Sequence, residues 1–338
     1  MAQITRIGID LAKTIFQLCA VDPNGKLVYN KTVSRQKLAE HLVQTPPCEI
    51  ILEACASAHY WSRVFTQMGH TVKMIHPQYV RPYVKTNKND ATDAEALCEA
   101  ASRPTMRFVQ GKSIAQQDAQ LLHRVRQRLV SQRTALANQI RGLLGEYGLI
   151  MPQGIGHVRK QLPSILEDAE NELTDTARQI FYCLYEELID LEKRVSLISG
   201  QIQQLSHRQT DCVRFMSAPG IGPMIATALF AVMGNPQHYR NGREFSAFLG
   251  LVPRQSSSGG KTKLGHISKR GDPQTRSLLV MGAQSALYRM HNKQDQLSRW
   301  ACRLRERKGT NIAAVALANK LARICWAMAV RQTEYQAA

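Results

Sequence analysis

The chain has 338 residues, of which 44% are hydrophobic, a proportion typical of a globular protein and too high for an intrinsically disordered one. Its 44 lysine and arginine residues outnumber 26 acidic ones, which gives a net charge of +18 and a pI of about 9.8. This excess predicts a polyanionic partner, for which nucleic acid, a ribosome-like particle or an anionic membrane surface would each suffice.

The positive charge is concentrated in two regions. Residues 1–100 carry a net charge of +2, residues 101–160 carry +8, residues 161–208 carry −5, and residues 209–338 carry +13. Two basic regions on either side of an acidic one indicate specific polyanion-binding surfaces, because a charge that served only solubility would be spread more evenly.

The cysteines and the apolar segments indicate a cytoplasmic protein. The eight cysteines form no C-x-x-C pair, so we do not expect a zinc knuckle. Several lie in apolar runs, where a free thiol behaves as a small core residue. The N-terminus lacks a signal-peptide pattern, and the longest apolar run, Met224–Gly234, has the length of a core helix. We therefore expect no membrane partner.

Residues 1–112 predict a mixed α/β domain. Alternating apolar residues indicate three strands, with a turn at Asp22-Pro23-Asn24-Gly25 between the second and third. Helices and strands then alternate. The expected strands are 4–11, 16–21, 26–33, 49–53 and 71–75, and the expected helices are 35–44, 57–68 and 90–101. This order matches the ribonuclease-H-like (RuvC-like) fold, although other mixed folds share it.

Residues 113–208 predict long helices. The first covers about 113–147 and is rich in arginine and glutamine, and the second covers roughly 160–207. Apolar residues of the second helix alternate in spacing between four and three, which is the pattern of a coiled-coil seam. This seam packs either against the first helix or against another subunit. Its members are Ala177, Phe181, Leu184, Leu188, Leu191, Val195, Ile198, Ile202 and Leu205.

Residues 209–338 predict an all-α domain without strands. Its expected helices cover 222–233, 242–248, 274–290, 294–307 and 311–331. Before the first of them, Pro219-Gly220-Ile221-Gly222 could form a helix-hairpin-helix-like turn, in which Gly220 and Gly222 let backbone N–H groups approach a phosphate. The alternative is an ordinary tight turn between two helices.

Four acidic residues could form a metal site. Asp10 and Glu53 lie in apolar, strand-like runs, where a carboxylate is costly unless it is paired or bound to a metal. Asp90 and Asp93 lie three residues apart on one face of a predicted helix. Together they could hold two divalent cations, Mg²⁺ or Mn²⁺. Alternatively, Asp90 and Asp93 only cap their helix. Glu95 is one turn away and is expected to be solvated.

A serine and glycine run lies among cations. Runs like Ser256-Ser257-Ser258-Gly259-Gly260 are usually flexible linkers. A phosphate-binding loop that ended at Lys261-Thr262 would need a glycine at residue 255, which is Gln255. A serine hydroxyl among cations can attack a phosphate when a metal or a base activates it. The cations expected to contact nucleic acid are Arg254, Lys261, Lys263, Lys269 and Arg270.

Taken in order, these motifs resemble the insertion-sequence transposases that join an RuvC-like DEDD domain to a C-terminal transposase domain with a catalytic serine. The bridge-RNA-guided recombinases belong to that family. The resemblance covers essentially the whole chain. Its markers are Ile7-Gly8-Ile9-Asp10, Leu52-Glu53-Ala54, Lys88-Asn89-Asp90-Ala91-Thr92-Asp93-Ala94, Pro219-Gly220-Ile221-Gly222, Phe245 to Pro253, Ser258-Gly259 and Ser268-Lys269.

The resemblance implies a division of labour along the chain. An RuvC-like DEDD domain would cover 1–112, long coiled-coil helices 113–208, and a transposase domain 209–338. The nucleophile would be Ser258, the serine that precedes a glycine five residues beyond Pro253, with Ser256 and Ser257 as adjacent alternatives. The metal ligands would be Asp10, Glu53, Asp90 and Asp93.

The resemblance also implies partners. They would be DNA, as element ends and target, a structured noncoding guide RNA, and further copies of the chain in a dimer of dimers, at the nucleoid in the cytoplasm. Two other functions stay open at this stage. One is a metal-dependent Holliday-junction resolvase in which water is the nucleophile, and the other is a non-catalytic scaffold that binds nucleic acid.

Overall fold

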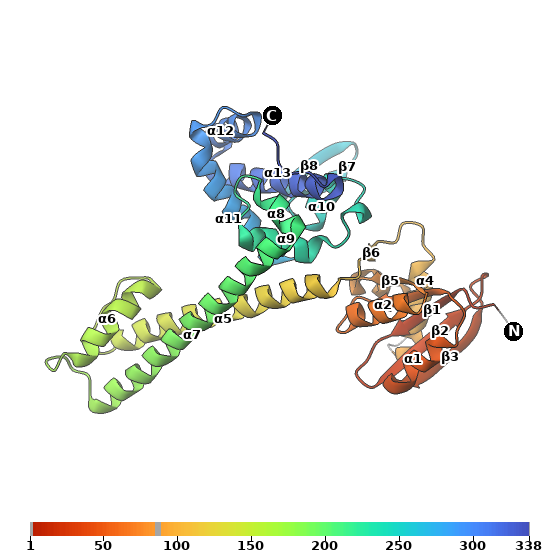
Figure 1. The fold of residues 1–338 in the computed structure, drawn as a ribbon, viewed down its shortest axis with the longest axis horizontal. Helices are drawn as coiled ribbons and strands as arrows, with labels where there is room; N and C mark the ends of the chain where they lie inside the picture. The colour runs from red at the N-terminus through yellow and green to blue at the C-terminus, as the bar shows by residue number, and fades with distance from the viewer. Residues whose placement is uncertain (1–2, 85–88, 338) are drawn as a thin grey trace. The chain divides into compact units, whose positions relative to one another are not determined.

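The structure is a computed structural model that describes residues 3–84 and 89–337 (Figure 1). Contacts divide the chain after Ile114 into two units, which are described separately. We call them the N-terminal unit (1–114) and the C-terminal unit (115–338).

The N-terminal unit is built on a six-stranded mixed sheet with the order β3-β2-β1-β4-β5-β6. β1, β2 and β3 are antiparallel, β1, β4 and β5 are parallel, and β6 is antiparallel to β5. The predicted strands are confirmed to within two residues at their ends. These five are β1 (Arg6–Asp10), β2 (Ile15–Val21), β3 (Leu27–Ser34), β4 (Glu49–Glu53) and β5 (Thr71–Ile75). The sixth strand, β6 (Phe108–Val109), was not predicted.

Helices cover both faces of this sheet. Side chains of α1 (Arg35–Val43) and α2 (Ala58–Gln67) share a core with Ile7 and Ile9 of β1. On the other face, α4 (Asp90–Ala101) packs against Ile51 of β4. The short segments α3 (Pro77–Val80) and η1 (Arg81–Tyr83) precede α4 in the chain. The predicted α/β architecture is therefore confirmed, including the bounds of α4.

In the C-terminal unit, the predicted second long helix is wrong in one respect. The segment forms two helices, α6 (Ile155–Glu167) and α7 (Asp175–Arg208), after the first long helix α5 (Ile114–Gly145). The intervening turn is stabilised locally, because the Asp168 carboxylate and the Asn171 amide oxygen accept hydrogen bonds from backbone N–H groups two residues on. The Thr174 side chain then caps α7.

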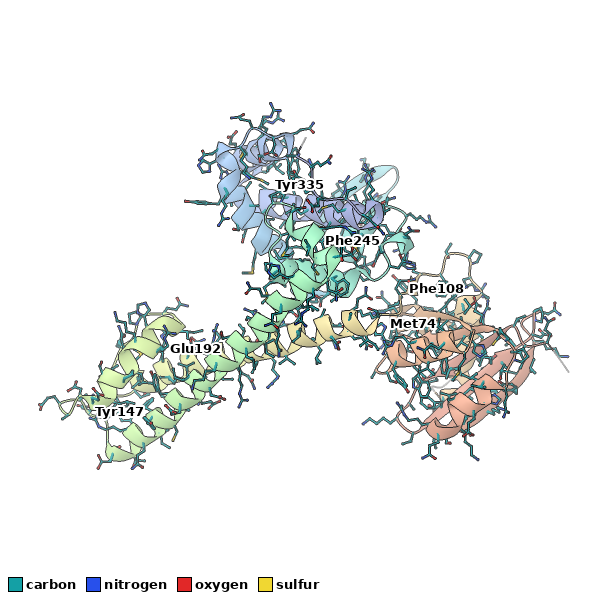
Figure 2. All side chains as sticks on the ribbon, viewed as in Figure 1. Met74, Phe108, Tyr147, Glu192, Phe245 and Tyr335 are labelled. Carbon is teal, nitrogen blue, oxygen red and sulfur yellow. The ribbon has the colours of Figure 1, made fainter. Side chains whose placement is uncertain are left out.

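The regular apolar positions of α7 are buried or half-buried within one chain. Phe181, Leu188 and Leu191 belong to a core shared with residues of α5 and α6, such as Leu136 and Val158. Figure 2 marks this region by Tyr147, which follows α5, and Glu192 on α7. Of the two packing arrangements that the sequence left open, the structure shows the intramolecular one.

The remaining helices surround a second core, in which Phe245 is fully buried (Figure 2). Five of them were predicted, with bounds that agree to within two residues: α9 (Pro223–Met233), α10 (Gly242–Phe248), α11 (Pro273–Arg289), α12 (Gln296–Lys308) and α13 (Thr310–Arg331). The helix α8 (Thr210–Met216) and the short segments η2 (Pro236–His238) and η3 (Met290–Asn292) were not predicted.

One of these helices, α13, is long and apolar enough to cross a membrane by length and composition, with a mean hydropathy of 1.4 over its most apolar window. Half of that window is buried inside the protein, where Leu317, Leu321 and Cys325 are fully buried. Its apolar character therefore has an explanation in the core of the helical bundle.

The prediction that residues 209–338 contain no strand is wrong. Residues Pro253–Ser258 (β7) and Lys261–Ile267 (β8) form an antiparallel hairpin. The two residues between the strands, Gly259 and Gly260, have φ angles of 55° and 76°. A two-residue turn with both φ angles positive matches the twist of a hairpin, and glycine adopts it without steric cost. The serine run is therefore part of a strand rather than a linker.

Candidate functional site

Asp10 and Glu53 end two neighbouring parallel strands. In the β1–β4 ladder Ile9 is paired with Leu52, so the next residue of each strand is one of the two acids. Successive side chains of a strand point to opposite faces, so Asp10 shares a face with Gly8, and Glu53 shares a face with Ile51. Because Ile51 packs in the core with α4, both acids belong to the α4 face of the sheet.

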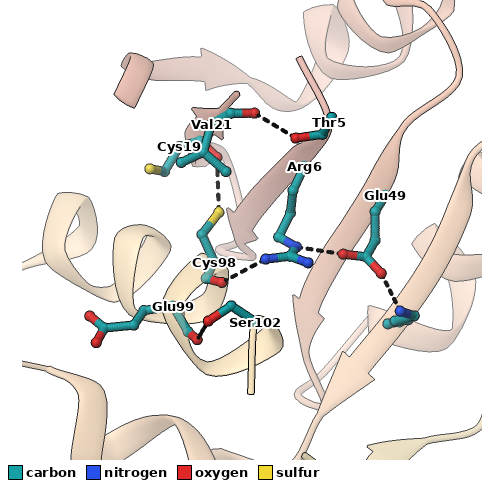
Figure 3. Close-up of polar contacts among 9 residues, drawn as sticks. Thr5, Arg6, Cys19, Val21, Glu49, Cys98, Glu99 and Ser102 are labelled. Carbon is teal, nitrogen blue, oxygen red and sulfur yellow. Dashed lines mark hydrogen bonds and ion pairs between the residues drawn. The ribbon is translucent and has the colours of Figure 1, made fainter. Parts of the chain in front are cut away.

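The direction of α4 brings its two acids to the same end of the sheet. A Cβ atom at Gly8 would lie 2.3 Å from the carbonyl oxygen of Ala94, so α4 crosses β1 at this glycine. One turn further along α4, the carbonyl oxygen of Cys98 accepts a hydrogen bond of 3.2 Å from Nη1 of Arg6, as Figure 3 shows. The helix therefore runs antiparallel to β1, and its first turn lies towards the carboxyl end of that strand.

That first turn contains Asp90, which is exposed, and Asp93, which is partly buried. The alternative that these acids cap the helix is wrong. Asn89 is the N-cap, its side chain accepts a hydrogen bond from the Thr92 N–H, and the Thr92 hydroxyl completes a capping box. The helix start is thus stabilised without either acid. Lys88, part of the same motif, lies outside the described residues.

The charge of two acids reaches one thiol. The pKa of Cys55 is raised by burial first, and then by the charges of Glu53 and Asp10. Cys55 follows β4 in a turn in which its N–H donates to the Glu53 carbonyl oxygen at 2.8 Å. The Cys55 thiol thus lies within electrostatic reach of both carboxylates, in keeping with their position at the ends of β1 and β4.

The chemistry of the four acids fits a hard divalent cation. Carboxylate oxygens are the ligands that Mg²⁺ and Mn²⁺ prefer. Within residues 3–84 and 89–337, no group of three or more His, Cys, Asp or Glu side chains has a spacing that could hold a metal ion. Mg²⁺ usually keeps several waters and binds through one or two carboxylates together with substrate phosphates, so a closed protein cage is not required.

Ser258 lies on the cationic face of the β7–β8 hairpin. Ser258 is paired with Lys261, and Ser256 with Lys263, so these four residues share one face. Ser257, paired with Thr262, belongs to the other face, where its Oγ accepts a hydrogen bond of 2.9 Å from Nε2 of Gln255. The hairpin therefore distinguishes Ser257 from the other two serines.

The base of the hairpin is held where two backbone segments cross. A Cβ atom at Gly250 would lie 2.1 Å from the Arg270 carbonyl oxygen, and one at Gly271 would lie 2.1 Å from the Phe248 carbonyl oxygen. Lys269 donates its N–H to Gly250 and adopts a left-handed φ of 54°. The side chains of Lys269, Arg254 and Arg270 are exposed around this base, so these cations are attached to a part of the hairpin that close backbone packing holds in place.

The two glycines of the predicted helix-hairpin-helix-like turn differ. They lie between α8 and α9, which pack against each other. A Cβ atom at Gly220 would lie 2.4 Å from the Gly282 carbonyl oxygen of α11, so this glycine has a packing function. At Gly222 the Cβ position is open. Phosphate binding at either residue stays a prediction.

Gly8 is the functional residue that the sequence analysis passed over. It contains no reactive group, but its missing side chain lets α4 approach β1 and so sets where Asp90 and Asp93 lie. A glycine inside a predicted strand is itself a signal of close backbone approach, so the sequence contained a way to find it.

Two family models match this chain. Residues 212–299 match the family described as "Transposase IS116/IS110/IS902 family", and residues 7–149 match the DEDD transposase family of IS110. The first match contains the serine hairpin, and the second contains the four acids.

Relatives match over nearly the full length. A "Probable family 20 transposase" of Pseudomonas aeruginosa is 46% identical, over 98% of this chain and 99% of its own length. The "Transposase for insertion sequence element IS1111A" of Coxiella burnetii is 44% identical, over 99% of this chain and 92% of its own. More distantly, a "Pilin gene-inverting protein" of Moraxella lacunata is 24% identical, over 82% of each chain.

Proposed function

The chain belongs to the IS116/IS110/IS902 family of insertion-sequence transposases, and from this premise we propose that it cleaves and exchanges DNA strands with Ser258 as the nucleophile. Residues 7–149 match the DEDD transposase domain, which implies the ribonuclease-H-like fold that the mixed sheet of the N-terminal unit fits. The family is one of DNA-processing enzymes that typically use a divalent metal ion.

The observation that carries the proposal is the position of Ser258 on the hairpin. It is the last residue of β7, it is exposed, and Lys261 and Lys263 share its face. In the proposed step, Ser258 Oγ forms a bond to a DNA phosphorus atom while the bond from phosphorus to the 3′ oxygen breaks, and the hydroxyl proton of Ser258 passes in net terms to that oxygen, which leaves as a 3′ hydroxyl. One phosphate diester replaces another, so attack by a 3′ hydroxyl can reverse the step and rejoin the strand without ATP. The two ammonium groups would stabilise the charge that develops on the phosphate oxygens.

The four acids supply the second part of the proposed site. Asp10, Glu53, Asp90 and Asp93 would hold Mg²⁺ or Mn²⁺, which when bound neutralises phosphate charge and stabilises the leaving oxygen. Ser258 belongs to the C-terminal unit and the acids to the N-terminal one. The proposal therefore requires the two units to meet on DNA, from one chain or from two subunits.

The partners of the reaction complete the proposal. DNA would occupy the basic regions 101–160 and 209–338, with Gly220, Gly222, Arg254, Lys261, Lys263, Lys269 and Arg270 among its contacts. A structured noncoding RNA would supply the target sequence, and the protein would recognise the shape of that RNA. Two DNA ends with two strands each suit a dimer of dimers in the cytoplasm, at the nucleoid.

A resolvase that uses water is the main alternative, because the four acids alone would suit it. The resemblance to a protein named for inverting a gene favours the serine reaction, since inversion requires strands to be rejoined as well as cut. An enzyme that only hydrolyses DNA would leave ends that it cannot reseal.

The test is to trap a covalent 5′-phosphoserine adduct on a nicked, end-labelled DNA and to resolve it on a denaturing gel. We expect Ser258→Ala to abolish the adduct and to preserve DNA binding. Ser257→Ala is the matched control, because Ser257 belongs to the opposite face of β7, and Ser256→Ala tests the serine that shares the cationic face. Loss of the adduct in Ser257→Ala and its retention in Ser258→Ala would move the nucleophile by one residue. A wild-type protein that never attaches to DNA would refute the serine mechanism in favour of water.

A further inference from the structure

A second cationic site lies away from the hairpin, between α10 and α13. A pocket of about 450 Å³ opens there, and its lining includes Asn241, Gly242, Arg243, Lys320, Arg323 and Trp326. Three of these side chains are cationic, and none of the lining residues is acidic. The net charge of the pocket lining is therefore positive.

The pocket is held in place by close packing. A Cβ atom at Gly242 would lie 3.1 Å from the Cα atom of Arg323, so the lack of a side chain at Gly242 lets α10 approach α13 at this point. On α13, Lys320 and Arg323 are three residues apart and thus share one face. Asn319 also links α13 to α10, because its Nδ2 donates a hydrogen bond of 3.3 Å to Ser246 Oγ.

Among the described residues, no acidic side chain forms an ion pair with Arg243, Lys320 or Arg323. The acidic residue of α10, Glu244, accepts a hydrogen bond from the backbone N–H of Arg240, and its own N–H donates to Asn241 Oδ1. Lys320 Nζ instead lies 4.3 Å from the centre of the Trp300 ring, a cation–π contact. The pKa of Lys320 is lowered by burial and by the charge of Arg323. Like charges held this close repel one another until an anion binds between them.

We propose that this pocket binds a backbone phosphate of the DNA on which the transposase acts. The inference rests on the proposed function, because it takes DNA as the partner. Guanidinium groups such as those of Arg243 and Arg323 match a phosphate with two parallel hydrogen bonds, and an ammonium group adds a point charge. Such a contact would read no base, so it would position the DNA rather than select its sequence.

The pocket is joined to the serine hairpin by α13. Asn319 Nδ2 donates a hydrogen bond of 3.1 Å to the carbonyl oxygen of Leu251, two residues before β7 begins. A phosphate held by Lys320 and Arg323 would thus bind to a helix that is hydrogen-bonded to the segment leading into β7. The site would hold a phosphate of the same DNA at a distance from the one that Ser258 attacks.

The test compares two double variants of the full-length protein. Lys320→Gln with Arg323→Gln removes two charges from the pocket, and Arg307→Gln with Lys308→Gln removes two exposed charges from the end of α12, outside it. The affinity for a fluorescein-labelled DNA duplex is measured by anisotropy over a salt series. We expect the pocket variant to bind at least about tenfold more weakly, and its slope of log affinity against log salt to shrink by roughly one. The control variant should change less than about threefold.

A folding control uses the same variants. Because relief of the repulsion between Lys320 and Arg323 offsets the loss of the Lys320–Trp300 contact, the replacement should change the melting temperature little while DNA affinity falls, a combination that a merely structural residue would not give. Equal DNA affinity and slope in the two double variants would overturn the pocket. A loss of affinity seen with RNA and not with DNA would also overturn it. Adduct formation by the wild-type protein in parallel keeps the proposed function separate, since it tests Ser258 and not the pocket.

Discussion

Replacing Gly8 by alanine should displace the helix that carries Asp90 and Asp93. The new Cβ atom would lie 2.3 Å from the Ala94 carbonyl oxygen, 3.0 Å from Cys98 Sγ and 3.2 Å from Leu97 Cβ. Ordinary contacts between carbon and oxygen are about 3.3 Å or more, so α4 would have to move by roughly 1 Å. Backbone cannot turn away as a flexible side chain can.

Two magnitudes follow from that shift. Overpacking of this kind costs about 1–3 kcal/mol of folding free energy. A displacement of catalytic groups by about 1 Å can slow a reaction about 100-fold. We therefore expect Gly8→Ala to lower the melting temperature by several degrees while the rate of strand cleavage falls by about two orders of magnitude.

The assay pairs thermal denaturation with single-turnover cleavage of end-labelled DNA. Gly142→Ala in α5 is the control, because its Cβ position is open and alanine favours a helix over glycine by up to about 1 kcal/mol. A Gly8→Ala protein that cleaves DNA at the wild-type rate and melts at the wild-type temperature would refute the reasoning about α4.

Three further predictions concern other parts of the molecule. Asp10→Asn keeps the shape of the side chain and removes its charge, so Mg²⁺-dependent cleavage should be lost while the melting curve is retained; near wild-type cleavage would exclude the proposed metal site. Leu191→Asp places a charge in the core of α5, α6 and α7, where Leu191 is 6% exposed, and should destabilise the protein by several kcal/mol; an unchanged melting curve would show that the position is not buried. Burial lowers the pKa of His123 to about 4, so the unfolded state binds more protons than the folded state between about pH 4 and pH 6.5. Up to about 3 kcal/mol of folding stability should therefore be lost as the pH falls through that range. In acid denaturation curves, His123→Gln should weaken this pH dependence, and an equally steep loss in the variant would assign the dependence to other groups.

Local patterns in the sequence determined most of the secondary structure. Apolar runs mark β1, β2 and β4 because helices cover both faces of these central strands. The bounds of α4 were predicted to the residue, since its capping box is made by Asn89 and Thr92 within one turn. The four acids and the serine run could also be identified from the sequence, because each is unusual among its neighbours in the chain.

Two predictions of secondary structure were wrong, because the local sequence patterns there favoured another conformation. The regular apolar spacing of α7 favoured one continuous helix, so the turn at 168–174 that separates α6 from α7 was not predicted. The hairpin was missed because serine, glycine and lysine have little preference for strands. Its strands are exposed on both faces, so no apolar alternation marks them.

Only the tertiary structure decided which distant residues come together. Asp10 and Glu53 are neighbours because β1 and β4 are parallel and in register, and the first turn of α4 lies towards the same end of the sheet because Gly8 lets that helix cross β1 closely. Arg243 meets Lys320 and Arg323 because α10 packs on α13 at Gly242. Such pairings depend on packing between segments far apart in the chain, whereas periodicity, caps and turns act over a few residues. The amino-acid sequence by itself therefore determined which elements form and which groups are reactive, and the packing of helices on strands and on one another decided where those groups meet.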